Sequence, residues 1–374
     1  MKKLNQTLLR KNIEETQNYD FENKKVFGSA YYVSQEGEFE LEVVRGVMSL
    51  QGNEPVSRNT LFRLASMTKP VTAFAALLLE DRKLLSISDP VEKYLPEFGK
   101  IKIITDDREI VGAPEKTPTI LNILTHSSGI GTSLKKNAWL TREEKSDRDK
   151  FLQAMLEHGL DFEPGTKQQY SGIGAFNVLS KIIEIVSGKN LEEFFRTEIF
   201  ESCGMTDTCF DPSEELIKRI IVLHDRKENE NAEFFNPDGC IFGDYPTTHY
   251  LGGGGLLSTL SDYAKFAKML LHGGCINGKR LLDENTFKKM RTPQVSKDIM
   301  PGAQRWGLGV RVITEREYPY LPVNTFGWSG AYGSHFWVDP DNGITAVYMK
   351  NSRFDGGAGN ESARNFEKAV YTAI

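Results

Sequence analysis

Residues 60–82 read TLFRLASMTKPVTAFAALLLEDR, and the interpretation of the whole chain starts from this stretch. After Ser66 nearly every side of the segment is apolar, which predicts a buried helix that begins near Ser66. Residues three apart lie on one helical face, so we expect the Ser66 hydroxyl to meet the Lys69 amine. An unpartnered lysine in so apolar a segment would be costly, which favours a function for Lys69.

The Ser66–Lys69 spacing suits nucleophilic catalysis. A serine hydroxyl is a weak nucleophile and needs a neighbouring base. Lys69 is that base if burial lowers its pKa from about 10.4 towards about 7–8. The N-terminus of the helix favours negative charge, which would help an alkoxide form at Ser66. The same spacing also occurs in a helix cap followed by a surface lysine, so the surrounding sequence must decide.

Segments on either side of this helix predict strands near both termini and helices between them. Residues 27–36 and 39–47 are rich in Val, Tyr and Phe, which predicts a β-hairpin. From about 84 to 235 apolar residues recur at helical spacing, as in IGAFNVLSKIIEIVSGK (173–189), where Gly188 is expected to end the helix. Short β-type runs return at 307–314, 324–330, 333–339 and 342–350, and a helix is expected at 361–373.

This order predicts an α+β fold with an antiparallel sheet flanked by helices and an inserted all-helical subdomain. Residues 1–80 and 236–374 would form a discontinuous sheet domain, and residues 81–235 would form the helical subdomain. A cleft between two such parts is the default position of a ligand site. We therefore expect the active site there.

Further motifs follow in a fixed order. They are LTHSSGI (124–130), FEPGTKQQYSG (162–172), GGGGLLSTLSDYAKF (252–266), WGLGV (306–310) and GWSGAYGSHFWVDP (327–340). Together with FRLASMTKPVTAFAALLLEDRKLLSISDPVEKYLP (62–96), they resemble the serine β-lactamase and penicillin-binding-protein superfamily. The branch they resemble most contains class C β-lactamases, D-alanyl carboxypeptidases and family VIII carboxylesterases. S-x-x-K is a signature of this superfamily, and the resemblance covers nearly the whole chain.

The resemblance implies a second catalytic element at Tyr170-Ser171-Gly172. In relatives this tyrosine works with the lysine as general base and returns the proton to the leaving group. A phenol held near a cationic amine is expected to have a lowered pKa. The usual third residue is Asn, and Gly172 lacks the side-chain amide that would bind a substrate carbonyl or steady Lys69.

The resemblance also implies a substrate-binding strand triad, here Trp328-Ser329-Gly330. Its first residue is usually basic and holds an anionic carboxylate, whereas Trp328 offers an apolar wall and one N–H donor. Esterases of the superfamily often carry Trp-x-Gly at this place. The oxyanion hole would be the backbone N–H groups of Ser66 and Ala331, which stabilise charge that grows in the transition state.

These residues predict a serine hydrolase with an acyl-enzyme intermediate, and they favour a carboxylesterase that acts on small or apolar esters without a cofactor. A β-lactamase or D-alanyl-D-alanine carboxypeptidase with the same nucleophile is one alternative, and its substrate would be an amide. A catalytically silent, penicillin-binding-like protein that only binds a ligand is another. Acyl transfer to an acceptor other than water also stays open, as does the oligomeric state.

Three other patterns have competing interpretations. Gly327-Trp328-Ser329-Gly330-Ala331 nearly matches the nucleophile elbow G-x-S-x-G, but no carboxylate lies between Ser329 and His335, the only later histidine. The run Gly252–Gly255 lacks the Gly-Lys-Ser/Thr of a phosphate loop, which favours close backbone approach near the cleft. His126 is interpreted as a structural, hydrogen-bonding histidine.

Composition narrows the class of protein. The 374 residues carry a net charge of −5 with both signs interspersed, which argues against a nucleic-acid binder. No apolar run approaches the ~18 residues of a membrane span, and no secretory leader is recognisable, so a cytoplasmic location is expected. The four cysteines, Cys203, Cys209, Cys240 and Cys275, have no metal-ligand spacing and are expected to be reduced. No HExxH pair occurs, and we predict no metal.

Overall fold

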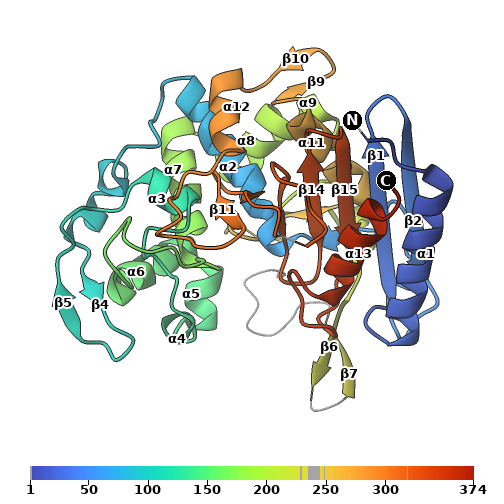
Figure 1. Ribbon diagram of the computed structural model, residues 1–374. Coiled ribbons are helices and arrows are strands. Elements are labelled where there is room, and N and C mark those ends of the chain that lie inside the picture. The colour runs from blue at the N-terminus through green and yellow to red at the C-terminus, as the bar shows by residue number, and fades with distance from the viewer. Residues whose placement is uncertain (1, 228–229, 235–244, 248, 318) are drawn as a thin grey trace.

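The central feature of the fold is a seven-stranded antiparallel sheet with the strand order β11-β12-β13-β14-β15-β1-β2 (Figure 1). A computed structural model describes residues 2–227, 230–234, 245–247, 249–317 and 319–374. The N-terminal hairpin pairs with the last strand, so both ends of the chain build one sheet, as predicted. The predicted fold class, an antiparallel sheet flanked by helices, is confirmed.

Six of the seven strands fall close to the predicted segments, and the exception is Gln304–Trp306, which precedes the run predicted at 307–314. The seven strands have the following bounds. They are β1 (Gly28–Gln35), β2 (Phe39–Gly46), β11 (Gln304–Trp306), β12 (Arg311–Ile313), β13 (Phe326–Ser329), β14 (His335–Asp339) and β15 (Ile344–Met349). Gly37 has a φ of +73°, which permits the tight β1–β2 turn. Every residue of β1 is buried, because both faces of the sheet are covered by helices.

Alternate residues of β1 face two different helical layers. Tyr31 and Val33 pack with α1 (Gln6–Glu22) and α13 (Glu361–Tyr371) on one face of the sheet. Ala30 and Tyr32 belong to the larger core on the other face, which includes α11 (Leu260–Leu271). Figure 1 shows α1 and α13 side by side in front of the sheet.

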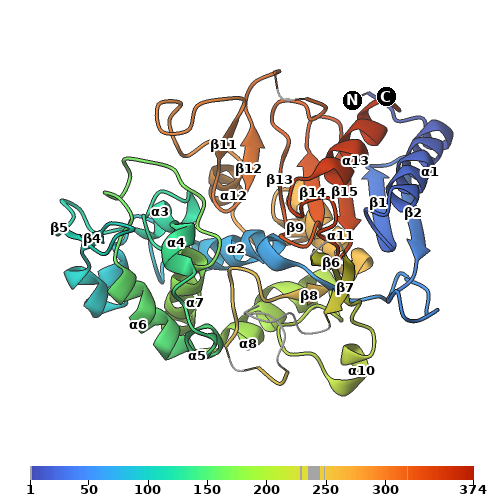
Figure 2. The same cartoon turned by 90° about the horizontal axis from the view of Figure 1, so that it is seen from below.

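The buried helix α2 (Thr68–Asp81) connects the sheet to the rest of the molecule. It packs against α7 (Gly174–Ser187), and Figure 2 shows it running from the sheet towards the helices of the middle segment. All residues from Thr68 to Leu79 are buried, as the apolar sequence predicts. Gly188 ends α7 in the left-handed conformation, with a φ of +69°.

The middle segment is mainly helical. Its helices are α3 (Ile120–Leu124), α4 (Leu134–Asn137), α5 (Arg142–Ser146), α6 (Arg148–His158), α7, α8 (Leu191–Phe195), α9 (Glu201–Cys203) and α10 (Glu214–Ile217). It differs from the expected all-helical subdomain by two small hairpins. These are β4 (Ile103–Ile104) with β5 (Ile110–Gly112), and β6 (Leu223–Lys227) with β7 (Glu230–Phe234). The domain boundaries at 80/81 and 235/236 stay a prediction.

The remaining elements are short. They are β3 (Phe62–Arg63) paired with β8 (Leu257–Ser258), β9 (Cys275–Ile276) paired with β10 (Lys279–Arg280), and α12 (Glu284–Met290). Among the described residues no helix has the length and apolar character to cross a membrane, and no group of His, Cys, Asp and Glu is arranged to hold a metal. Cys203, Cys209 and Cys275 are free thiols, while Cys240 lies outside the described residues.

Candidate active site

Ser66 lies in a strained turn directly before α2. It is the middle residue of the 3₁₀ turn η1 (Ala65–Met67), and Ala65 has a φ of +46°, which is rare for a residue with a side chain. Ser66 is half-buried, whereas its two neighbours are buried. Strained backbone of this kind persists where the surrounding structure holds it, and it is common at functional sites.

Lys69 is buried, with 1% of its surface exposed, and its amine makes three hydrogen bonds. Nζ lies 3.2 Å from the Ser66 hydroxyl oxygen, 3.0 Å from the carbonyl oxygen of Gly172 and 2.6 Å from that of Gly253. Burial lowers the pKa of this amine to about 7, from an ordinary value of 10.5. No carboxylate is among these partners, so little opposes the effect of burial.

These three partners suit both protonation states of the amine, since an ammonium would donate a hydrogen bond to each of the three oxygens. A neutral lysine amine has two N–H donors and one lone pair. The two carbonyl oxygens accept the two N–H groups, and the lone pair is left to accept the proton of the Ser66 hydroxyl. The arrangement therefore suits Lys69 as a general base towards Ser66.

Two glycine segments bring these carbonyls to the amine. Gly172 takes part through its backbone, so its missing side chain does not remove the contact with Lys69. A Cβ on Gly252 would lie 2.2 Å from the hydroxyl oxygen of Ser180, so only glycine lets this run approach the helices so closely. The prediction of close backbone approach at Gly252–Gly255 is confirmed at this position.

Tyr170 stands beside the Ser66–Lys69 pair. Its ring centroid is 5.2 Å from Lys69 Nζ, and its hydroxyl is near enough to that of Ser66 for Ser66 to act on its pKa. Burial raises the pKa of Tyr170 to about 12, although hydrogen bonds with Ser66 and Trp328 act in the opposite direction. The expected lowering of this pKa is wrong, because the effect of burial is larger than that of the two hydrogen bonds. Tyr170 therefore holds its proton in the resting site.

Two tryptophans enclose Tyr170. The indole Nε1 of Trp328 donates a hydrogen bond of 3.2 Å to the Tyr170 hydroxyl oxygen. Trp306 stacks nearly parallel to Tyr170, with ring centroids 6.0 Å apart and an angle of 13° between the planes. Trp306 is not among the predicted site residues, although it belongs to the motif WGLGV, which is the signal that marks it.

The end of β13 brings Ala331 close to the nucleophile turn. A Cβ on Gly330 would lie 2.2 Å from the carbonyl oxygen of Leu64, so this strand end packs directly on the backbone two residues before Ser66. Ala331 itself is exposed. Within the described part of the chain, the N–H groups of Ser66 and Ala331 have no hydrogen-bond acceptor. Both donors are thus available to a developing oxyanion.

The side chain of Ser329 does not join this cluster. Its hydroxyl is hydrogen-bonded to His335 Nδ1 at 2.8 Å, and His335 Nε2 lies 3.0 Å from the Glu367 carboxylate. No carboxylate lies between Ser329 and His335 in the sequence, but the fold brings Glu367 of α13 to His335. All three side chains are buried between the sheet and α13. A substrate therefore has no access to this row of Ser329, His335 and Glu367.

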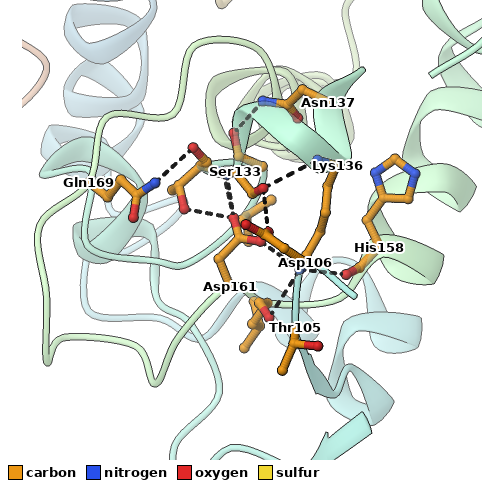
Figure 3. Close-up of polar contacts among 12 residues, drawn as sticks. Thr105, Asp106, Ser133, Lys136, Asn137, His158, Asp161 and Gln169 are labelled. Atoms are coloured by element: carbon orange, nitrogen blue, oxygen red, sulfur yellow. Dashed lines mark hydrogen bonds and ion pairs between the residues drawn. The ribbon is translucent and has the colours of Figure 1, made fainter. Parts of the chain in front are cut away.

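A buried ion pair supports the segment before Tyr170 (Figure 3). Lys136 Nζ lies 2.5 Å from Asp161 Oδ1, and both side chains are almost wholly buried. Asp161 Oδ2 also accepts hydrogen bonds from the N–H groups of Thr132 and Ser133, at 2.7 and 2.8 Å. The carbonyl oxygen of Thr132 in turn accepts a hydrogen bond of 3.1 Å from Gln169 Nε2. The residue before Tyr170 is therefore tied to a buried charge pair.

Comparison with known proteins adds family information to this geometry. A family model described as Beta-lactamase matches residues 9–369. Protein Rv1367c of Mycobacterium tuberculosis is 29% identical over 331 residues, which cover 81% of this chain and 80% of that protein. Esterase EstB of Burkholderia gladioli is 26% identical over 367 residues, which cover 90% of this chain and 88% of that protein.

A solved structure shows the same fold. EstCE1, described as a hydrolase with promiscuous acyltransferase activity, superposes with a TM-score of 0.80 at 21% identity. The superposition covers 98% of this chain and 99% of that one. At this identity the likeness concerns the fold, and the chemistry has to be argued from the residues of this chain.

Proposed function

The chain belongs to the beta-lactamase family, and from this premise we propose that it is a serine hydrolase whose acyl-enzyme forms on Ser66. The family and the relatives indicate a hydrolase of the beta-lactamase fold. The observation that carries the finer proposal is the set of three contacts made by the buried Lys69, which in the neutral amine leaves the lone pair for the Ser66 proton.

The proposed reaction has two steps. Lys69 takes the proton of Ser66, whose oxygen attacks the substrate carbonyl carbon. The N–H groups of Ser66 and Ala331 stabilise the oxyanion. The C–O bond to the alcohol then breaks, and the alcohol leaves with a proton from Tyr170, which Lys69 replenishes. In the second step Tyr170 and Lys69 take a proton from water, which attacks the acyl carbon, and the proton returns to Ser66.

Trp328 points to uncharged or apolar esters as the substrate class. Its indole N–H is already donated to Tyr170, so the position offers an incoming acyl group an aromatic surface and no cation. A carboxylate-bearing β-lactam or D-alanyl peptide is usually held by a basic residue at this place in the superfamily. An ester without a charge needs no such partner. The similarity to EstB, an esterase by name, supports the same proposal.

Acyl transfer to an alcohol is a second candidate outcome of the same acyl-enzyme. EstCE1, which has the same fold, is described as a hydrolase with promiscuous acyltransferase activity. The aromatic rings of Trp306, Trp328 and Tyr170 make the surroundings of Ser66 partly apolar, which favours an alcohol as competitor to water. A product assay with added short alcohols separates the two outcomes.

The decisive experiment is intact-protein mass spectrometry after treatment with a fluorophosphonate, followed by turnover assays. The assays use short and long p-nitrophenyl esters beside nitrocefin, with Ser66→Ala as the matched control. One adduct on the wild type, none on the variant and ester turnover would support the proposal. Nitrocefin turnover without ester turnover would make the protein a β-lactamase. Absence of any adduct would favour the silent, ligand-binding alternative.

A further inference from the structure

His126 is a buried titratable residue that the proposed reaction does not use, and it contacts both neighbours of Tyr170. It follows α3 in the turn Thr125–Ser128, with a φ of +54° and no exposed surface. Its backbone carbonyl oxygen accepts a hydrogen bond of 3.0 Å from the N–H of Gln169. Its imidazole Nδ1 accepts a hydrogen bond of 3.1 Å from the N–H of Ser171.

The contact between Nδ1 and the N–H of Ser171 defines the tautomer of the imidazole. Because a backbone N–H can only donate, Nδ1 has to carry a free lone pair, and the single proton of the neutral ring lies on Nε2. A doubly protonated ring would turn a second N–H against the N–H of Ser171 and lose the contact. Burial, with a contribution from the charge of Lys69, lowers the pKa of His126 well below 6.5, so the neutral form holds at physiological pH.

The imidazole ring also supports the phenol ring directly. Ring centroids of His126 and Tyr170 are 4.5 Å apart, and the imidazole also contacts Trp306 at 4.3 Å and Phe176 at 5.3 Å. Tyr170 is therefore held on its backbone on both sides and on its ring. Lys69 is the ionisable group on α2 that interacts with His126, and it does so through its charge.

We propose that His126 is a positioning residue for Tyr170. By accepting the N–H of Ser171 on Nδ1 and the N–H of Gln169 on its carbonyl, it holds the phenol hydroxyl against Trp328 and Ser66. The inference rests on the proposed function, since it assigns His126 to the same site. The proposal gives His126 more than a structural role, because it makes the position of the Tyr170 hydroxyl depend on the Nδ1 atom of His126.

The test compares two neutral replacements. In His126→Asn the amide oxygen occupies nearly the place of Nδ1, and asparagine tolerates a positive φ. In His126→Gln the amide oxygen falls near the place of Nε2, so the acceptor for Ser171 is lost. The readout is the indole ¹H–¹⁵N resonance of Trp328, assigned with Trp328→Phe, because this N–H donates to the Tyr170 hydroxyl. Tyr170→Phe provides the reference shift for a lost acceptor.

We expect His126→Gln to move the Trp328 resonance in the direction of Tyr170→Phe, and His126→Asn to keep it near the wild-type position. For a p-nitrophenyl ester, kcat of the Gln variant should fall about 10–100-fold with KM within about twofold, and Asn should restore most of it. The control Glu184→Gln removes the partly buried Arg148–Glu184 ion pair of α6 and α7 and should leave the resonance unchanged.

An unmoved Trp328 resonance in folded His126→Gln would overturn the inference. If the Gln variant does not fold, His126→Leu, which matches Asn in shape but has no acceptor, provides the same comparison. The resonance needs no substrate, so its outcome is independent of the proposed function. Lack of ester turnover by the wild type would reject the proposed hydrolase activity. The positioning of Tyr170 by His126 would still be tested by the Trp328 resonance alone.

Discussion

The amine of Lys69 lies 3.2 Å from the hydroxyl oxygen of Ser66, and its two remaining hydrogen bonds go to backbone carbonyl oxygens. Carbonyl oxygens accept N–H donors without adding a full negative charge. Burial therefore lowers the pKa of Lys69 to about 7, with no nearby carboxylate among its partners to raise it again. The site thus holds a base whose pKa is near neutral pH, which is favourable for proton transfer.

The pKa of Lys69 predicts how activity depends on pH. The amine acts as base only in its neutral form, so kcat/KM should rise with pH and level off above a midpoint of about 7. The measurement is kcat/KM for a p-nitrophenyl ester from about pH 5 to about pH 9, with the rate of fluorophosphonate labelling as a second probe. A midpoint of kcat/KM at about pH 4–5 would instead indicate a carboxylate base and contradict the assignment of Lys69 as the base.

Trp328→Phe tests the hydrogen bond to Tyr170. Phenylalanine keeps an aromatic wall but lacks the N–H that donates to the phenol oxygen at 3.2 Å. One hydrogen bond contributes about 1 kcal/mol, so kcat should fall about fivefold while KM for apolar esters changes little. Steady-state kinetics with a matched ester series provides the measurement. A rise in KM with unchanged kcat would mean that Trp328 acts only in substrate binding.

The buried Lys136–Asp161 pair should matter mainly for stability. Asp161→Asn leaves the Lys136 ammonium buried beside a neutral amide, which should lower the free energy of unfolding by about 3–5 kcal/mol. Urea denaturation followed by circular dichroism gives this quantity. Adding Lys136→Met removes the uncompensated charge, and we expect the double variant to recover part of the loss. No recovery would show that the hydrogen bonds to Thr132 and Ser133 carry the effect.

Ser329→Ala separates the two serines that sequence motifs single out. The Ser329 hydroxyl is buried and bonded to His335, so its loss should leave ester turnover within about threefold of the wild type. Stability should fall by about 1 kcal/mol, because His335 loses one partner. Parallel assays of Ser329→Ala and Ser66→Ala provide the comparison. Equal loss of activity in both variants would revive the nucleophile elbow at residues 327–331.

Sequence predicted those parts of the molecule that depend on local patterns. The hairpin of β1 and β2 follows from β-branched and aromatic residues around Gly37, and the buried helix α2 follows from its apolar residues on all sides. The burial of Lys69 follows from the same segment. The β4–β5 hairpin was not predicted, because its strands are very short and Ile110 and Val111 are exposed, so no alternation marks them.

Contacts between distant backbone atoms were beyond the reach of sequence. Any residue has a carbonyl group, so nothing in the sequence marks Gly172 and Gly253 as partners of Lys69. The destination of the Ser329 side chain depends on which face of β13 it occupies and on Glu367, which lies 38 positions later in the chain (367 − 329) on α13. The raised pKa of Tyr170 follows from burial, which one loop motif does not determine.

Two glycines at the site should respond in opposite ways to an added side chain. At Gly172 a Cβ would meet only Tyr170 Cε1, at 4.0 Å, and the carbonyl to Lys69 would remain. Gly172→Asn, which restores the residue usual in the superfamily, should therefore fold normally and keep ester turnover within about threefold. A Cβ at Gly330 would lie 2.2 Å from the Leu64 carbonyl oxygen and 2.3 Å from the Ser334 hydroxyl oxygen.

Gly330→Ala must therefore push the end of β13 away from the nucleophile turn. Ala331 follows directly, so its N–H should move out of reach of the oxyanion, and kcat should fall about 100-fold or more. Steady-state kinetics of both variants, with thermal unfolding as a check on folding, provides the test. Equal activity of Gly330→Ala and the wild type would remove Ala331 from the oxyanion hole. Loss of activity in Gly172→Asn would show that the space beside Tyr170 belongs to the substrate.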